Sequence, residues 1–304
     1  MTETVRSGSA ARRKNRAPLC MLAAAVLFSL GGMLFKLVPW NSMAISCARS
    51  TLAGVMLFVY MKLRGHRIVM NRAVLLGGFA MGATSTLYAV AAKLTTAANA
   101  ILLQYTAPVF IILLMWIFFR VKPAWLDIGA TAVLLCGIVL FFASSLSGGG
   151  GTVAGNILAL VSGVTWDMVF MMKQWKGADN LSSVFFGCVF CVVIGLPWLF
   201  AEDVVWTAPA VGGILLIGLI QFGAAYVFMA EGLEGTPPLA ASLISMLEPI
   251  LNPIWVAMTV GEVPGGLSLA GAIIVVLGVL VYNLLKARAE KGSAREDAAE
   301  DAGR

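Results

Sequence analysis

Charged residues are scarce in this chain. Only 12% of its 304 residues are Asp, Glu, Lys or Arg, while 60% are hydrophobic and the mean hydropathy is +0.92. An average soluble domain has about 25% charged and about 45–50% apolar residues. Because a folded chain of this length has a large surface to cover, so few charges exclude a soluble globular protein.

Histidine and cysteine are also few, which limits the chemistry that the chain can support. His66 is the only histidine, and this excludes a His-ligated metal centre and a His-based catalytic triad. The five cysteines are odd in number and lie in or beside apolar runs, so no disulfide framework follows. Cys188 and Cys191 form a CxxC without a second pair, and we interpret them as small core residues. We expect no metal and no cofactor.

The sequence contains ten long apolar runs. A helix needs about 20 apolar residues to cross a bilayer, and each run ends at a proline, a glycine cluster or charged residues. A transmembrane β-barrel would need short segments of alternating polarity, so helices are favoured. The predicted spans are 18–38, 42–62, 72–93, 97–119, 124–146, 153–173, 180–200, 208–232, 237–260 and 266–286. The expected fold is an all-α membrane protein with ten transmembrane helices.

Lysine and arginine residues are concentrated in alternate loops. With the N-terminus in the cytoplasm, cytoplasmic segments hold 18 of the 21 positive residues, and only Lys36, Arg49 and Lys93 lie elsewhere. This bias predicts a multi-pass protein of the plasma membrane with both termini in the cytoplasm. Charges gathered in loops indicate membrane orientation rather than nucleic-acid binding, so we expect no nucleic-acid partner.

The two halves of the chain are similar to each other. A shift of 141 residues aligns Thr95 with Thr236 and Pro108 with Pro249, among other pairs. Each half has five helices, and because five is odd, the second half enters the membrane from the opposite side. Two inverted five-helix repeats of this kind are typical of secondary transporters, whose substrate site lies near the midplane between the halves.

The repeat also predicts the domain organisation. We expect a basic cytoplasmic N-terminus at 1–17, a first five-helix repeat at 18–147, a Gly-rich linker at 148–152, a second five-helix repeat at 153–286 and a disordered cytoplasmic tail at 287–304. The Gly run of the linker is not followed by Gly-Lys-Ser or Gly-Lys-Thr, so it is not an ATP-binding loop. The charged, Ala-rich composition of the last segment predicts disorder.

The order of these features resembles the drug/metabolite transporter superfamily, in its ten-helix EamA-type exporter branch. The resemblance covers about residues 18–286 and is carried by Arg49, Tyr88-Ala89-Val90, the run from Thr95 to Ala100, Pro108, Glu248-Pro249, Gly261-Glu262, Gly271 and Gly278. The first half departs from the family pattern at Arg120-Val121, where Gly-Glu often follows the fourth helix. This departure falls in a loop and is expected to affect topology signals rather than the substrate.

The resemblance implies a secondary transporter that exports small metabolites by alternating access across a bacterial inner membrane. Amino acids, aromatic ones included, are the favoured substrates, and the implied partners are this small molecule and membrane lipid. Other solute classes (sugar, nucleotide-linked or drug-like) stay open as alternatives. An integral-membrane enzyme would need catalytic side chains converging at a membrane face. A channel would need a ring of filter residues, and five plus five inverted helices fit that poorly.

Pro108 and Pro249 occupy aligned positions inside spans four and nine. A proline inside a helix frees the carbonyl four residues earlier, here that of Gln104 and that of Ser245. Two alternatives follow. Either these carbonyls line a substrate cavity as hydrogen-bond acceptors, or the prolines only kink their helices.

A polar stripe crosses span nine at Ser242, Ser245, Glu248 and Asn252. Spacings of three, three and four residues place these side chains on one helical face. A bare carboxylate near mid-span is costly and needs a partner. Glu248 could bind a substrate ammonium, carry protons or hold a structural network beside Pro249. The structural network is favoured, because the family has this Glu-Pro pair across different substrates.

Three aromatic residues with one polar atom each lie inside the spans, at Tyr88, Tyr105 and Trp166. Such side chains suit an amphiphilic ligand, with helix packing as the alternative role. The candidate substrate-binding set is Ser29, Ser85, Tyr88, Gln104, Tyr105, Trp166, Asp167, Ser245 and Glu248.

Arg49 lies seven residues into span two, about 10 Å from its outer end. It could attract a substrate carboxylate at the outer mouth. A structural pairing with helix C-terminal carbonyls, or with Glu202 and Asp203, is at least as well supported.

Overall fold

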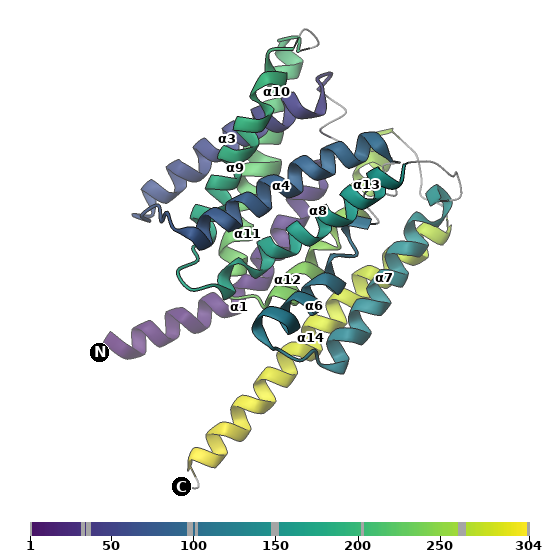
Figure 1. Cartoon of the computed structure of the whole chain (residues 1–304). Coiled ribbons are helices and arrows are strands. Elements are labelled where there is room, and N and C mark those ends of the chain that lie inside the picture. The colour runs from purple at the N-terminus through teal and green to yellow at the C-terminus, as the bar shows by residue number, and fades with distance from the viewer. Residues whose placement is uncertain are drawn as a thin grey trace.

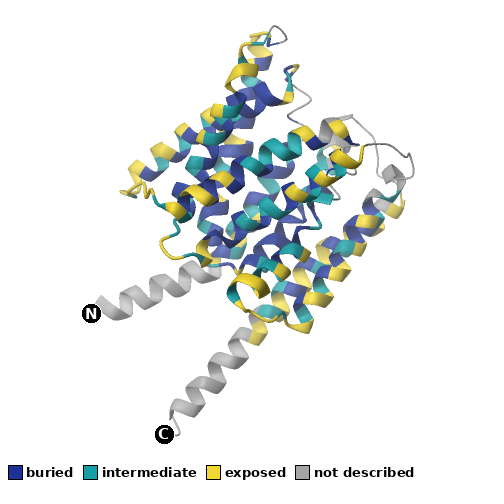
Figure 2. Cartoon of the chain, in the orientation of Figure 1, coloured by how far each residue is buried: buried dark blue, intermediate teal, exposed yellow. Residues whose placement is uncertain are grey.

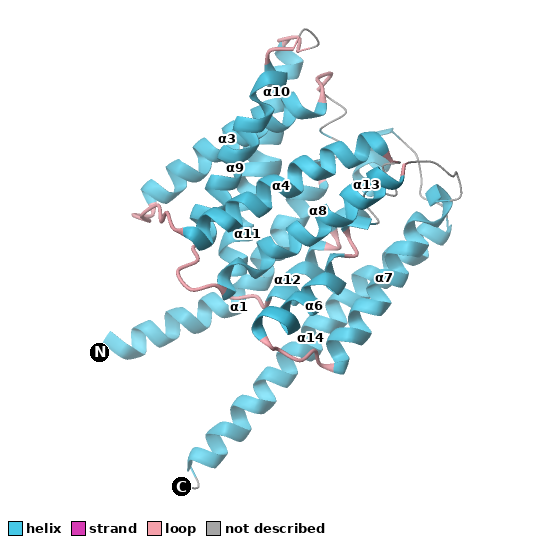
Figure 3. Cartoon of the chain, in the orientation of Figure 1, coloured by secondary structure: helices cyan, strands magenta, loops and turns pink. Residues whose placement is uncertain are grey.

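A computed structural model describes residues 2–31, 34, 38–95, 100, 103–146, 152–201, 204–260 and 266–302. The elements of these residues are helices (Figure 3). Those of the first half are α1 (Thr2–Ser29), α3 (Ser42–Leu63), α4 (Arg72–Leu94), α6 (Ala107–Phe119) and α7 (Trp125–Leu146). Those of the second half are α8 (Val153–Met171), the 3-10 helix η1 (Met172–Gln174), α9 (Asn180–Leu199), α10 (Ala208–Leu215), the π-helix η2 (Leu216–Ala224), α11 (Ala225–Leu233), α12 (Pro238–Ser245), α13 (Glu248–Val260) and α14 (Gly266–Ala302).

These helices correspond to the ten predicted spans, and the all-α membrane fold is confirmed. The eighth span is continuous through α10, η2 and α11, whereas the ninth is divided into α12 and α13. Within the described residues, six helical segments are long and apolar enough to cross a bilayer by themselves, among them Ser42–Leu63 and Ala208–Leu233. The predicted linker at 148–152 lies outside the described residues except for Thr152, and Lys36 also lies outside them.

Polar side chains in the loops determine where several helices begin. Asn41, Asn71, Thr152, Asp179 and Thr207 each precede a helix and accept a hydrogen bond from a backbone N–H of its first turn. Such N-caps satisfy donors that have no partner within the helix, which typically stabilises a helix by about 1 kcal/mol. The short polar loops therefore end one span and position the next.

Helices of the two halves are interleaved, and their contacts occur in matching pairs. α4 packs on α8 as α1 packs on α11, and α4 packs on α9 as α3 packs on η2 (Figure 1). In the same way α6 contacts α8, while α1 contacts α12 and α13. The pairs α3–α9 and α7–α14 match themselves when the halves are exchanged. This pattern is expected for two inverted repeats related by a pseudo-twofold axis.

Glycines allow the closest of these contacts. A Cβ added to Gly271 in α14 would lie 2.4 Å from the backbone nitrogen of Phe141 and 2.6 Å from the carbonyl oxygen of Gly137, both in α7. In the Gly78–Gly82 pair of α4, an added Cβ would meet Phe186 and Phe190 of α9. Small residues at such positions let membrane helices approach closely, where packing stabilises their association.

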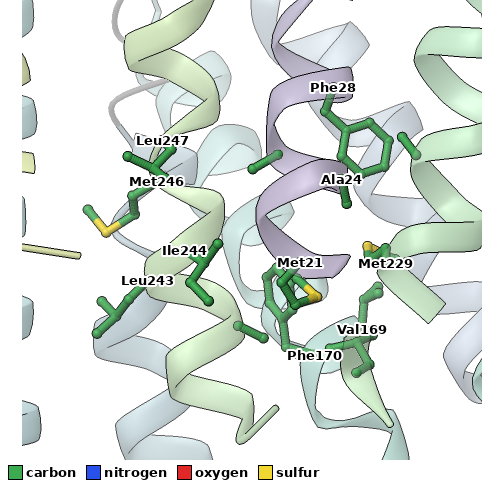
Figure 4. Close-up of a cluster of buried hydrophobic side chains, with 14 of the residues drawn as sticks. Met21, Ala24, Phe28, Val169, Phe170, Met229, Leu243, Ile244, Met246 and Leu247 are labelled. Atoms are coloured by element: carbon green, nitrogen blue, oxygen red, sulfur yellow. The ribbon is translucent and has the colours of Figure 1, made fainter. Parts of the chain in front are cut away.

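The buried core surrounds α1. Met21, Ala24 and Phe28 of α1 lie among apolar side chains of α8, α11 and α12, including Phe170 and Met229 (Figure 4). Buried residues concentrate between the helices, and exposed ones lie along the outer faces (Figure 2). Large apolar side chains cover these outer faces, as expected for a surface in contact with lipid.

The two aligned prolines begin helices instead of kinking continuous ones. Pro108 is the second residue of α6 and Pro249 the second of α13, after turns at 105–106 and 246–247. In the first turn of a helix the missing proline N–H would have no partner in any case. The interpretation of Pro108 and Pro249 as kinks within helices was therefore wrong. Spans four and nine are interrupted just before them.

The C-terminal segment also differs from its prediction. The expected disordered tail at 287–304 is helical as far as Ala302, as a continuation of α14. Its many Ala, Lys, Arg and Glu residues have high helix propensity, which extends the helix past the apolar span. The terminal helices α1 and α14 project from the same side of the bundle (Figure 1).

Arg120 has a backbone conformation that favours glycine, with φ 55° at the end of α6. Gly65, which follows the end of α3, has a similar φ of 65°. We expect Arg120→Gly to raise the free energy of unfolding by about 1 kcal/mol, because a left-handed non-glycine residue is strained. Thermal unfolding in detergent measures this change. Gly65→Ala is the reverse control and should lower stability by a similar amount. A stabilising Gly65→Ala or a destabilising Arg120→Gly would contradict the expectation.

Candidate functional site

Arg49 is held inside the bundle by α4 and the π-helix η2. Its guanidinium donates a hydrogen bond to Ser85 Oγ at 3.1 Å and lies 4.0 Å from the ring centroid of Phe222. A guanidinium over an aromatic face is stabilised by the ring quadrupole, and more strongly where water is excluded. Arg49 is only partly exposed, so this positive charge lies within span two rather than in a loop.

Aromatic rings continue from Arg49 into the core. Phe222 contacts Tyr226 and Phe28 edge to face, with centroids 4.3 Å and 6.2 Å apart. Phe28 then contacts Trp166 at 6.5 Å, and Trp166 contacts Phe170 at 5.0 Å. These rings come from α1, α8, η2 and α11 and therefore join both halves. Edge-to-face pairing is a favoured arrangement of aromatic rings, so these contacts stabilise the packing of the two halves against each other.

Glu248 begins α13 directly after the break in span nine, and it is partly exposed. The Tyr105 hydroxyl, from the break in span four, acts as a side-chain hydrogen-bond donor to its carboxylate. Tyr88 of α4 lies within electrostatic reach of the same carboxylate. The two helix breaks therefore bring Tyr105 and Glu248 together, and α4 adds the second phenol, Tyr88.

Glu248 and Arg49 lie close enough to act on each other electrostatically. In the described part of the chain no ion pair joins the two side chains directly. A positive and a negative group therefore lie in one part of the bundle, Arg49 over the ring of Phe222 and Glu248 beside the hydroxyl groups of Tyr105 and Tyr88. We call Arg49, Ser85, Tyr88, Tyr105 and Glu248 the central cluster.

The structure separates the predicted site residues into two groups. Ser85, Tyr88, Tyr105 and Glu248 belong to the central cluster. The remaining predicted residues are Ser29, Gln104, Trp166, Asp167 and Ser245, which lie in contacts between or within helices. Trp166 packs between Phe28 and Phe170, as described above.

The two serines of the second group, Ser29 and Ser245, form hydrogen bonds inside the bundle. Ser29 is fully buried, donates to the carbonyl of Val26 at 2.6 Å and accepts from Trp255 Nε1 at 2.8 Å. Ser245 donates to the carbonyl of Ser242 at 2.6 Å.

The Gln104 carbonyl has a structural neighbour. A Cβ added to Gly163 of α8 would lie only 2.7 Å from its oxygen, so α8 covers this carbonyl closely. The hypothesis that the carbonyl lines a cavity gains no support from this contact.

Sequence reasoning placed Arg49 at an outer mouth and left it out of the candidate set. The available signal was an arginine within an apolar span, which by default marks a functional site. Gln221 and the π-helix around it were also missed. Gln221 is buried in η2 and donates to the carbonyl of Phe28 at 3.1 Å, which ties η2 to α1. Helical segments of π type occur frequently at functional sites.

A cavity of about 130 Å³ lies away from the central cluster, between α6, α7, α12 and α14. Lys286 and Asp127 form an ion pair at 3.0 Å at its wall, and the buried Tyr282 donates to the same carboxylate at 2.9 Å. These contacts tie α7 to α14. The chemistry of this wall is structural, and the central cluster is the better candidate for the functional site.

Comparison with known proteins identifies the family. The sequence profile of the EamA-like transporter family matches residues 15–143 and, a second time, residues 153–284. The chain belongs to the EamA-like transporter family. The double match confirms two repeats of one domain within the drug/metabolite transporter superfamily. This EamA-like transporter is therefore a multi-pass membrane protein that moves a small molecule, and it is not an enzyme.

Two curated relatives support the same assignment. The EamA-like transporter is 28% identical over 281 residues to the uncharacterized transporter YwfM of Bacillus subtilis, covering 87% of this chain and 93% of the relative. It is 24% identical over 260 residues to the uncharacterized inner membrane transporter YedA of Escherichia coli, covering 80% of each chain. A protein of known crystal structure superposes with a TM-score of 0.79 at 18% identity, covering 91% of this chain and 99% of the other. That likeness concerns the fold.

Proposed function

We propose that this transporter exports amino acids, aromatic ones included, from the cytoplasm by alternating access. The observation that carries the proposal is the pair of opposite charges in the central cluster. A free amino acid presents a carboxylate and an ammonium on one carbon, and Arg49 and Glu248 offer the complementary groups. A guanidinium recognises a carboxylate through a planar fork of donors, which a lysine ammonium would not provide.

The rings of the central cluster support the same substrate class. Tyr88 and Tyr105 each combine an apolar ring with a hydroxyl, and Phe222 lies beneath the Arg49 guanidinium. Sites for small ligands are lined mostly by apolar and aromatic side chains, with a few polar groups that fix orientation. A phosphorylated solute would need several cations. Among the side chains that the structure describes within the central cluster, Arg49 is the sole cation.

In this proposal Glu248 binds the substrate ammonium, and Tyr105 holds its carboxylate in place. This replaces the purely structural role favoured from the sequence, because Arg49 lies in the same cluster. Ser85 orients Arg49 through its hydrogen bond. Trp166, Ser29, Gln104 and Ser245 position the surrounding helices and do not touch the substrate.

Transport by purified protein in liposomes tests the substrate class. We expect efflux or uptake to increase from alanine to leucine, phenylalanine and tryptophan, because each larger side chain buries more apolar surface against the rings. Burial of one aromatic side chain corresponds to about 1.5–3 kcal/mol, or roughly tenfold or more in affinity. A sugar phosphate and a neutral sugar serve as controls. Preference for either control over every amino acid would overturn the proposal.

We further propose that both termini lie in the cytoplasm and that the repeats extend over 18–147 and 153–286. The positive-residue bias supports this orientation. In a variant without native cysteines, a membrane-impermeant thiol reagent applied to intact cells should label a cysteine at Thr207 and not one at Arg64 or Lys176. The reverse labelling pattern would overturn both the orientation and the direction of export.

A further inference from the structure

Asp167 is a carboxylic acid with no exposed surface, buried between helices near the end of α8. It lies in α8, one turn after Gly163, and 0% of the residue is exposed. This face of α8 covers the break in span four, where Gly163 lies against the Gln104 carbonyl. The backbone of Ile111, in the helix that follows the break, forms a hydrogen bond with the Asp167 carboxyl group. Asp167 therefore lies where a helix of the second half covers a break of the first.

The polar partners of this carboxyl group are few. Ser242 Oγ, from α12, donates to Asp167 Oδ1 at 3.4 Å. The second carboxyl oxygen, Oδ2, has no hydrogen-bond partner in the described part of the chain. α4, α6 and α12 pack against α8, and α1 reaches it through the contact of Phe28 with Trp166. From these helices no charged or titratable side chain among the described residues acts on Asp167.

An ionised carboxylate is strongly disfavoured in such a place. It would lack both water and a cation, and one long hydroxyl contact together with the backbone of Ile111 cannot replace them. When the carboxylate binds a proton it becomes a neutral acid, and the penalty for burying a charge is avoided. We propose that Asp167 is a proton-binding site that couples transport to the proton gradient, separate from the amino-acid site of the central cluster.

The surroundings of Asp167 explain how a proton would affect conformation. α12 ends at the break in span nine and α6 begins at the break in span four, so both partners of Asp167 border an interruption. A movement of α12 away from α8 would break the Ser242 contact and admit water, and the carboxylate would then be tolerated. Proton affinity therefore differs between the packed and the opened arrangement. By linkage, a proton gradient then biases the equilibrium between them.

Infrared spectroscopy of the protein in liposomes tests the proton site without any substrate. We expect the carbonyl stretching band of protonated carboxylic acids at neutral pH, and Asp167→Asn should lose part of it. Asp127→Asn is the matched control, because the Asp127 carboxylate is ion-paired with Lys286 at 3.0 Å, whereas Asp167 has no cation beside it among the residues that the structure describes. If Asp167→Asn instead removes only intensity from the ionised carboxylate band, Asp167 is charged and the proposal is wrong.

A transport measurement tests the coupling, and it rests on the proposed amino-acid transport. Wild-type tryptophan transport should change when a proton gradient is imposed across the liposomes. For Asp167→Asn the ratio of rates with and without the gradient should fall to one. Ser242→Ala, which keeps the carboxyl group but removes its donor, should shift the pH midpoint of transport upward. An unchanged gradient response in Asp167→Asn would overturn the coupling.

The two proposals fail in different ways. If wild-type protein transports no amino acid while the infrared band is lost in Asp167→Asn, the proposed substrate class is wrong and the proton site stands. If amino acids are transported and the band is unaffected in Asp167→Asn, the proposed substrate class stands and the proton site is wrong. Where Asp167→Asn is inactive, the infrared measurement decides, because it needs folded protein only.

Discussion

Arg49→Ala is expected to abolish the preference of this transporter for a substrate that carries a carboxylate. Wild-type protein should transport tryptophan at least tenfold better than tryptamine, which lacks only that group. Removal of a charge-assisted hydrogen bond typically costs about 1.5–3 kcal/mol, which corresponds to roughly a tenfold to hundredfold loss of affinity. The affinity of the variant for tryptophan should fall by this factor, while its affinity for tryptamine should change little. Competition assays in liposomes with both compounds measure the ratio.

The reciprocal variant and two controls complete the experiment. Glu248→Gln should reduce selectivity for tryptophan over indole-3-propionate, which lacks the ammonium. Arg49→Lys keeps the charge but loses the planar fork and its stacking on Phe222, so we expect a partial loss. Ser85→Ala removes only the hydroxyl that accepts from Arg49 and should have a smaller effect. If Arg49→Ala weakens tryptophan and tryptamine equally, Arg49 has a structural role and does not bind the carboxylate.

Gly163→Ala is expected to be among the most damaging single-methyl substitutions in the chain. The added Cβ would lie 2.7 Å from the Gln104 carbonyl oxygen and 3.4 Å from its carbonyl carbon and Cα. All three are backbone atoms, so no side chain can rotate to make room. Overpacking of this kind typically costs about 1–3 kcal/mol. Because Tyr105 follows Gln104, the displaced break should also move its hydroxyl from Glu248 and reduce transport.

Gly129→Ala in α7 provides the matched control. An added Cβ there meets nothing within 4 Å, and alanine is the better helix former. It should therefore raise stability by about 0.5–1 kcal/mol and leave transport unchanged. Thermal unfolding in detergent and transport at equal protein incorporation measure both effects. Similar behaviour of Gly163→Ala and Gly129→Ala would show that α8 does not rely on this close approach.

Most of the fold could be predicted because a bilayer imposes a simple length on each apolar run. The repeat was visible as well, through aligned pairs such as Pro108 and Pro249. The interruptions of spans four and nine were not predicted. A proline in an apolar run is compatible both with a kink in one helix and with the start of a new helix. The helical extension of α14 was not predicted. The charged, weakly hydrophobic composition of the tail indicated disorder, whereas its Ala, Lys, Arg and Glu residues also have high helix propensity.

The site was predicted less completely, for a reason of geometry. Periodicity shows which residues share a face of one helix, but not which faces meet. Tyr105 and Glu248 were both candidates, but nothing in the sequence predicted that the Tyr105 hydroxyl and the Glu248 carboxylate would be hydrogen-bonded. Asp167 lies one residue after Trp166 and points into a different contact, against Ser242. Arg49 was assigned by its depth along one helix, whereas its partners Ser85 and Phe222 come from two others.

The paired contacts of the interleaved halves have a further consequence for the energetics of transport. If the halves were identical in sequence, exchange of their conformations would convert an inward-open state into an outward-open state of equal free energy. Any resting preference must then arise at positions whose counterparts differ. Asp167 corresponds to Leu30 by the shift of 137 residues that aligns the sixth span with the first, and Arg120 corresponds to Gly261. Making such a pair alike, for example with Asp167→Leu, would remove the contribution of that pair to the free-energy difference between the two states.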